Sequence, residues 1–490
     1  MKKILSLFLS VIIAVLSVTS VLAVSVFAET DDNVAIHADD ALHTESYKLV
    51  NAKGEDVFLR GLNLGGWLIM EDWFCPVDNG SMGDLVTYRT LTERFGLEGC
   101  YELINIYQDN WIVEADFKNI ADMGFNCVRI PFWYRNFQSD DNGTWILDEN
   151  GEIDISRLEW AVEMCRKYGL YAILDLHGAN GCQGDTDHAG LNDSYHFFDQ
   201  NAKGEWYRAQ AVELWRVIAE RFAGDPAIAM FDLLNEPMCN VPLTQRVYSY
   251  YWEFYDDCYD VIRAEDPDRV ITMIGTWSMD KLPDPDEYGW KNVVYQYHQY
   301  DDAEADYTTR IANGWACYYD VPMYAGEFHP VGESVTLDFA INAYDSNDVI
   351  WTLWTYKGYN SWAAWTDWFA YGSTSGKYIV DLENDSYETI AYKWGEVMQT
   401  NSGTFVEARL YDVAKTYLPN ATLDDVPFNT QADIDSYVAG EVYIGDGYTG
   451  SNECFFCDFF KSFSDIPVVG SLVVWIHALV HSMFTSSNID

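Results

Sequence analysis

Two glutamates follow apolar runs at points where a strand would end. Glu236 lies in Asn235-Glu236-Pro237, and Glu327 comes directly after Gly326. Two carboxylates that face each other across a cleft suit glycosidic bond cleavage, because one can protonate the departing oxygen while the other attacks the anomeric carbon. A retaining enzyme holds them about 5–5.5 Å apart, and an inverting enzyme leaves more room for water. The fold must therefore bring two distant segments together.

The residues beside each acid bear on its presentation. Pro237 disfavours helical backbone at the preceding residue, so Glu236 is predicted to be extended. Proline also lacks an N–H group, so it can end a strand without leaving a donor unpaired. Because Gly326 has no side chain, we expect it to let substrate or backbone approach Glu327 closely.

Eight short apolar runs are candidates for the strands that would position these acids. The runs are continuous rather than alternating, which is typical of parallel strands covered on both faces. They span residues 57–63, 125–130, 170–176, 227–234, 269–274, 292–298, 321–327 and 348–354.

Helical patterns lie between most of these runs. Residues 154–169 carry apolar side chains at helical spacing, with Asp154 placed to cap the start and Gly169 the end. Residues 209–224 and 244–266 are two further long helix candidates.

Eight strands that alternate with helices predict an α/β protein, a (β/α)8 or TIM barrel over residues 46–418. The weakest connection lies between the fifth and sixth strands, where Pro283 and Pro285 leave little room for a helix. A doubly wound open sheet is the alternative, and the number of strands does not exclude it. However, the glycines after the first run, in RGLNLGGWL, lack the spacing of a dinucleotide-binding loop.

Chemistry in such barrels sits at the carboxyl ends of the strands. Cationic, imidazole, amide, phenol and indole side chains occur at these ends and would converge on one rim beside the two glutamates. They are Arg129, His177, Asn235, His298, Tyr300 and Trp354.

These residues together resemble glycoside hydrolase family 5, a family of retaining barrel enzymes. The resemblance implies that Glu236, in Asn-Glu-Pro, is the acid/base and that Glu327, in Gly-Glu, is the nucleophile. It also implies substrate-binding roles for the companions, which occur in VRIP, LDLHG, YHQY and the eighth strand: Arg129, His177, Asn235, His298, Tyr300 and Trp354.

Within that family, RGLNLGGWLIMEDW and HGANGCQGDTDHAG are similar to the exo-β-1,3-glucanase branch. The resemblance implies that Glu71 and Asp187 close off a pocket around a terminal glucose, as carboxylates that accept hydrogen bonds from sugar hydroxyls. Two departures bear on linkage and exo action. The branch usually has Gln-Asn-Gly where this chain has Gln183-Gly184-Asp185, and a glutamate common after the eighth strand is missing near WTYKGYN.

The implied mechanism is double displacement on β-glucan or a related polysaccharide or oligosaccharide. Glu327 must be ionised, which Arg129 would favour. Glu236 must begin protonated, with a pKa above the ~4.3 of free glutamate, and we expect the charge on Glu327 to raise it. No cofactor and no metal are expected, because no spacing supports either.

The net charge limits the class of partner, and the cysteine positions bear on disulfides and metal binding. The formal net charge of −48 disfavours nucleic acid and anionic lipid as partners. Cys127 and Cys165 fit free apolar thiols, Cys182 and Cys239 could pair, and one CxxC motif at residues 454–457 is too little for a zinc site.

The two ends of the chain differ from its middle. Residues 1–28 read as a signal peptide, which predicts a secreted protein, and residues 29–45 as a flexible acidic leader. Residues 419–452 resemble a linker. Residues 453–490 form a hydrophobic tail that could span a bilayer, lie at a membrane surface and retain the protein there, or dock on protein.

The sequence leaves alternative functions open. They are an endo-acting β-1,4-glucanase, xylanase or mannanase with an open cleft, and a non-catalytic sugar-binding barrel. The loop after the eighth strand holds Trp362, Trp365 and Trp368, and we expect at least one of these rings to stack on a sugar.

Overall fold

The computed structural model describes residues 35–238, 245–275, 278–317, 319–331, 334–359, 371–373, 378–400, 406–407 and 416–418. The chain divides into two compact units, Met1–Ile444 and Gly445–Asp490. The expected signal peptide, linker and tail lie outside the described residues, as do Cys239 and the three tryptophans Trp362, Trp365 and Trp368. Among the residues that are described, no helix is both long and apolar enough to cross a membrane.

Eight parallel strands close into a barrel, in the order β10-β11-β3-β5-β6-β7-β8-β9. Closure confirms the predicted (β/α)8 barrel and excludes the open doubly wound sheet. Each predicted run contributes one strand. They are β3 (Arg60–Asn63), β5 (Cys127–Trp133), β6 (Tyr171–Gly178), β7 (Ile228–Asp232), β8 (Ile271–Ile274), β9 (Val293–Gln299), β10 (Met323–Phe328) and β11 (Val349–Leu353).

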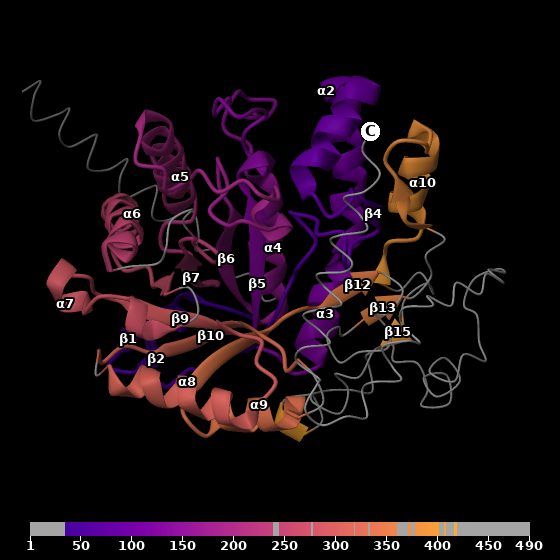
Figure 1. Ribbon diagram of the computed structural model, residues 1–490. Helices are drawn as coiled ribbons and strands as arrows, with labels where there is room; N and C mark the ends of the chain where they lie inside the picture. The colour runs from indigo at the N-terminus through magenta and orange to yellow at the C-terminus, as the bar shows by residue number, and fades with distance from the viewer. Residues whose placement is uncertain are drawn as a thin grey trace, which may run out of the picture. The chain divides into compact units, whose positions relative to one another are not determined.

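Helices flank the strands (Figure 1). Between β8 and β9 the described residues form only the four-residue α7 and a short 3-10 turn, so the prolines limit helix there as predicted. The helices are α2 (Asp84–Trp111), α3 (Glu114–Asp122), α4 (Ser156–Tyr168), α5 (Ala202–Arg221), α6 (Gln245–Glu265), α7 (Pro285–Tyr288), α8 (Glu304–Ala316), α9 (Leu337–Asp345) and α10 (Tyr387–Glu396).

Helix ends follow local chemistry, with one correction. Gly169 ends α4 at φ 74, as predicted for a left-handed cap. Asp154 is not the cap residue of α4, because Ile155 occupies that position and Asp154 Oδ1 instead accepts the N–H of Ser156 at 3.0 Å. Helix α5 begins earlier than predicted, where the Asn201 side chain accepts two backbone N–H groups.

The predicted flexible leader is wrong for its last residues. Leu42–Glu45 form strand β1, which pairs antiparallel with β2 (Lys48–Asn51). Leu42 and Leu49 are buried, and Ser46 allows the tight turn with φ 56. The hairpin forms because these apolar side chains gain burial against the barrel core.

Smaller sheets lie outside the barrel. Strand β4 (Val77–Asp78) pairs with β14 (Val380–Asp381), and β12 (Lys357–Tyr359), β13 (Tyr371–Ser373) and β15 (Val406–Glu407) form a second small sheet. Cys127, Cys165 and Cys182 are buried free thiols, so the possible pairing of Cys182 is not observed.

Gly61 allows β3 to lie close to β5. A Cβ atom at this position would overlap the backbone carbonyl and the Sγ atom of Cys127. The strand spacing at this seam therefore depends on a missing side chain.

We predict that Gly61→Ala lowers the free energy of unfolding by about 1–3 kcal/mol, because overpacking forces β3 away from β5. Denaturant unfolding followed by circular dichroism measures the loss. Gly395→Ala on α10 is the matched control, since its nearest neighbour would be Ile106 Cγ2 at 3.2 Å and alanine favours a helix. Equal stability of the two variants would contradict this account of the seam.

Candidate active site

A pocket of about 280 Å³ lies at the carboxyl ends of the barrel strands. Its volume lies just below the range for small-molecule sites, roughly 300–1,000 Å³. Most of the residues that the strand-end argument predicts line it together. The lining residues are Glu71, Trp73, His177, His188, Asn235, Glu236, Tyr300, Glu327 and Trp354.

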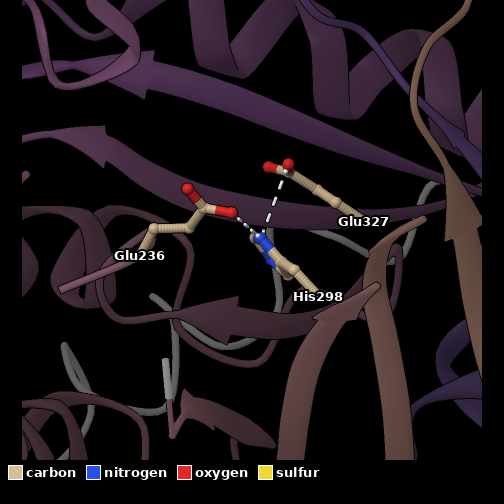
Figure 2. A group of neighbouring side chains, drawn as sticks. All are labelled: Glu236, His298 and Glu327. Carbon is tan, nitrogen blue, oxygen red and sulfur yellow. Dashed lines mark hydrogen bonds and ion pairs between the residues drawn. The ribbon is translucent and has the colours of Figure 1, made fainter. Parts of the chain in front are cut away.

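The two predicted acids meet across this pocket. Figure 2 shows the carboxyl groups of Glu236 and Glu327 on the same side of the His298 ring, which contacts both. One carboxylate oxygen of Glu236, one of Glu327 and one ring nitrogen of His298 all lie within 4.8 Å of one another. This separation fits the short spacing of a retaining pair, about 5–5.5 Å, rather than the 6.5–9.5 Å of an inverting pair.

Arg129 lies beneath the acids and is fully buried. Its Nη1 donates to Glu327 Oε1 at 2.7 Å and its Nε donates to Asp232 Oδ2 at 2.8 Å. Its Nη2 lies 3.0 Å from Asp175 Oδ1 and also donates to Asn235 Oδ1 at 2.9 Å. One guanidinium thus orients residues of three strands, β6, β7 and β10.

Three carboxyl groups surround the single positive charge of Arg129. Burial raises the pKa of Asp232 to about 7, although Arg129 opposes the shift. Burial likewise raises the pKa of Asp175 well above its usual range. Removing the guanidinium would leave these acids in a water-poor interior without a counter-charge.

Glu327 is held at both oxygens. Tyr300 donates its hydroxyl to Oε2 at 2.9 Å, and Arg129 binds Oε1. The expectation for Gly326 needs correction, because a Cβ there would overlap the Gln296 side-chain oxygen. Gly326 therefore makes room for a side chain of the neighbouring strand, and Gln296 uses that room to donate to Asp232.

The backbone of Glu236 is not extended, contrary to the prediction. Its φ is 36, which is rare for a residue with a side chain. Tertiary hydrogen bonds outweigh the local effect of Pro237: Asn235 N–H donates to Leu176 O at 3.0 Å, and Met238 N–H donates to Gln183 O at 2.7 Å. Strain of this kind persists where the surroundings over-determine it, which is common at functional sites.

The protonation of Glu236 depends mainly on its burial. Burial raises the pKa of Glu236, with His188 and Arg129 opposing and Asp185 adding to the shift. The charge of Glu327 is not among these causes, so the expectation that it raises this pKa is not supported. His298 Nδ1 lies 2.6 Å from Glu236 Oε1, and burial lowers the pKa of His298 to about 3, which keeps the ring neutral.

His177 and Trp354 form one wall. The Trp354 ring stacks on His177 with centroids 5.5 Å apart and planes at 11°. His177 Nδ1 lies 2.7 Å from Asp175 Oδ2, and Asn235 Nδ2 lies 3.4 Å from His177 Nε2. Burial lowers the pKa of His177 to about 3, so a neutral imidazole donates to Asp175 and leaves Nε2 as the acceptor.

Glu71 marks an acidic part of the pocket. Trp73 Nε1 donates to Glu71 Oε2 at 2.8 Å, and burial, reinforced by Asp187, raises the pKa of Glu71 well above its usual range. Burial and the charge of Asp72 raise the pKa of Asp187 to about 6. Asp187 interacts with Glu71 but does not line the pocket. Arg129 and His298 do not line it either, so any effect they have on substrate would pass through the two acids.

The same cluster can be tested as a metal site. The donor atoms of Glu236, His298 and Glu327 lie within metal-binding reach of one another. However, the Arg129 guanidinium touches Glu327 at 2.7 Å, and a metal cation beside it would be repelled. The geometry favours proton and nucleophile chemistry at the two acids.

Sequence reasoning missed several residues of the site. His188 Nε2 lies 3.6 Å from Glu236 Oε2, and Trp73 orients Glu71. His188 lies in HGANGCQGDTDHAG beside Asp187, and Trp73 lies in RGLNLGGWLIMEDW close to Glu71. Asp175 and Asp232 lie within predicted strand runs and carried no signal of their own, and only the barrel shows that both pair with Arg129.

Comparison with known proteins agrees with this site. The family model for cellulase, glycosyl hydrolase family 5, matches residues 88–368. The chain belongs to glycosyl hydrolase family 5. Both pocket acids Glu236 and Glu327 lie inside the matched segment, whereas Glu71 and Trp73 precede it.

Individual relatives differ in what they cleave. The chain is 31% identical over 261 residues to a glucan 1,3-beta-glucosidase of Candida oleophila. The aligned segment covers 49% of this chain and 58% of that protein. It is 29% identical over 262 residues to a beta-xylosidase of Phanerodontia chrysosporium. This alignment covers 53% of this chain and 52% of the beta-xylosidase. The chain thus spans just over half the length of these curated relatives. The solved structure of endogalactoceramidase has a TM-score of 0.48 and 19% identity, over 64% of this chain and 74% of that one.

We predict that Arg129→Met lowers the free energy of unfolding at pH 8 by about 3–5 kcal/mol, because it leaves buried carboxylates unpaired. The deficit shrinks toward pH 4. A buried acid whose pKa is raised in the folded state costs stability progressively as pH rises from its unfolded pKa, about 4, to its folded pKa, and Asp232 already titrates at about 7 with Arg129 present. Urea unfolding at several pH values measures this.

The matched control is Arg216→Met on α5. Arg216 pairs with Glu213 and Glu220 at the surface, where such pairs contribute less than about 1 kcal/mol. A loss of the same size in both variants, or a deficit independent of pH, would refute the role assigned to Arg129.

Proposed function

We propose that this chain is a retaining glycoside hydrolase that cleaves β-glucosidic bonds, acting as an exo-β-1,3-glucanase or β-glucosidase. The observation that carries the proposal is the approach of the Glu236 and Glu327 carboxyl groups to within 4.8 Å at a small pocket. Membership of the family and the glucan 1,3-beta-glucosidase relatives support the choice of bond.

Glu327 is the proposed nucleophile. Its oxygens accept hydrogen bonds from Arg129 and Tyr300, which orient the carboxylate toward the pocket. Attack on the anomeric carbon forms a glycosyl ester and expels the leaving group. Glu236 gives the departing oxygen its proton, which it holds because burial raises its pKa. In the second step ionised Glu236 takes a proton from water, which attacks the anomeric carbon and breaks its bond to Glu327, so that the sugar leaves and the Glu327 carboxylate is restored.

Asn235 and the pocket walls are the proposed sugar contacts. Asn235 lies next to Glu236 in the lining and can bind the 2-hydroxyl, an interaction that strengthens in the transition state. Glu71, with its raised pKa, can donate as well as accept a hydrogen bond, which suits a sugar hydroxyl. Asp187 would act beside Glu71 to limit the pocket.

The beta-xylosidase relative supports a second candidate, cleavage of xylosidic bonds by the same two acids. Its pentose substrate would leave the space of one hydroxymethyl group empty. The surrounding cellular role rests on sequence alone: residues 1–28 support secretion, and the composition of residues 453–490 supports retention at a membrane surface.

We predict that Glu327→Gln lowers the rate on laminarin and on an aryl β-glucoside by at least about a thousandfold, because no nucleophile remains. Glu236→Gln should keep most of its first-step rate on a dinitrophenyl glucoside, whose leaving group needs no proton. Proton NMR of early wild-type products should show β-glucose before mutarotation. Glu149→Gln, at an exposed position, is the control.

These outcomes separate the rival readings. If wild type and Glu327→Gln bind glucan equally well and neither hydrolyses it, the acids are not catalytic and a sugar-binding barrel is the better account. If α-glucose appears first, the enzyme inverts, and the short carboxyl separation does not describe the working state.

We predict that wild-type protein releases glucose alone from laminarin at all times of digestion, because the pocket of about 280 Å³ admits a chain end. Parallel digests of cellulose, xylan and mannan, with products resolved by anion-exchange chromatography, test the linkage. Mixed oligosaccharides in the early laminarin digest would mean endo action, and faster release of xylose from aryl xyloside would favour the second candidate.

A further inference from the structure

A second cleft, of about 590 Å³, lies between α2 and the segment that joins β5 to α4. It shares no lining residue with the active-site pocket, and it is about twice as large. The size lies within the range of sites that bind small organic ligands.

Aromatic rings form much of its wall. Tyr88, Tyr101, Phe137 and Trp145 all line the cleft. Tyr88 and Phe137 are almost fully buried, whereas the Trp145 and Tyr101 side chains are half-buried. Tyr88 and Tyr101 meet edge to face, with centroids 5.7 Å apart, so their orientations are fixed.

A polar group inside the cleft lacks a partner. Gln108 is only 6% exposed and lines the cleft. Its backbone carbonyl accepts from Trp67 Nε1 at 2.8 Å, but its side-chain amide has no hydrogen-bond partner among the described residues. Because Gln108 lines the cleft, the donor and acceptor of its amide are open to a ligand.

The shape of α2 contributes to the rim. The helix breaks at Gly96, where φ is 79 and ψ is 169, and Leu97 and Glu98 follow at the cleft. A Cβ at Gly96 would meet nothing within 4 Å, so the glycine serves the backbone turn rather than close packing. Leu97 is left 48% exposed, which extends the apolar rim.

Charge limits the class of ligand. Glu98 and Asp154 lie at the cleft, and its one guanidinium, on Arg157, already binds Asp109 Oδ1 at 2.7 Å. An anion would meet repulsion from these acids and from a chain of net charge −48. A neutral ligand with apolar faces and several hydroxyl groups matches both the rings and the free amide.

We propose that this cleft is a second, non-catalytic binding site for a neutral saccharide. Pyranose rings would lie against Trp145 and Tyr101 while a hydroxyl bonds the Gln108 amide. The assignment of the sugar as a β-1,3-glucan oligosaccharide rests on the proposed function, whereas the class of ligand rests on the cleft alone. Such a site would hold polymer on the flank of the barrel during turnover at the pocket.

Titration of laminaritetraose into full-length Glu327→Gln protein tests the proposal, because this variant should bind without turnover. Calorimetry should resolve two binding events. Trp145→Ala in the same background should weaken one event at least about tenfold and leave the other unchanged, through loss of ring contact. Gln108→Met should weaken the same event roughly two- to tenfold, the value of one hydrogen bond, without loss of fold because the amide has no protein partner.

Trp315→Ala is the matched control, since Trp315 is 37% exposed on α8 and away from this cleft. Hydrolysis of an aryl β-glucoside by otherwise wild-type Trp145→Ala should be unchanged, which reports an intact barrel. A single binding event, or two events that Trp145→Ala and Gln108→Met leave unaltered, would overturn the proposal. Sugar binding at the cleft without any hydrolysis would instead reject the proposed function and leave this site standing.

Discussion

The guanidinium of Arg129 is the interaction on which the site depends. It is buried among Asp175, Asp232 and Glu327, which come from three different strands. Without water to screen them, these groups interact strongly, and only a closed barrel brings them into contact. The cation therefore links the fold to the chemistry: it fixes the orientation of Glu327 and at the same time compensates charge that the core could not otherwise hold.

The two acids are prepared in different ways. Glu327 is held by donors on both oxygens, whereas Glu236 is held through its backbone, at φ 36, and next to the neutral His298 ring. Burial raises the pKa of Glu236 and so favours its protonated form, and direct contact with Arg129 provides a counter-charge for Glu327. The two identical side chains therefore stand in different environments, and acid-assisted displacement requires them to differ in protonation.

Much of this was predictable from the sequence, for physical reasons. Buried parallel strands are continuous apolar runs, so all eight could be located, and strand ends in a barrel must share one rim, so Glu236, Glu327, His177 and Tyr300 could be grouped. What failed depended on tertiary contacts. Pro237 describes only a local preference, which hydrogen bonds to Leu176 and Gln183 override.

The role of Gly326 likewise depends on Gln296, a residue of another strand, and the partners of Arg129 are visible only in three dimensions. The hairpin at Leu42–Glu45 was missed because four residues between acidic neighbours give a weak signal, and its strength comes from burial against the barrel.

The pairing of β3 with β11 in the barrel has a consequence for folding during synthesis. The residues of β3 pair with β11 through Trp351 and Arg60, so the earliest barrel strand bonds the last one. While the polypeptide is being synthesised, that edge of β3 has no partner until β11 has emerged. Unpaired strand edges promote association between chains. Nascent copies of this protein therefore share an aggregation hazard that ends only when the final strand docks.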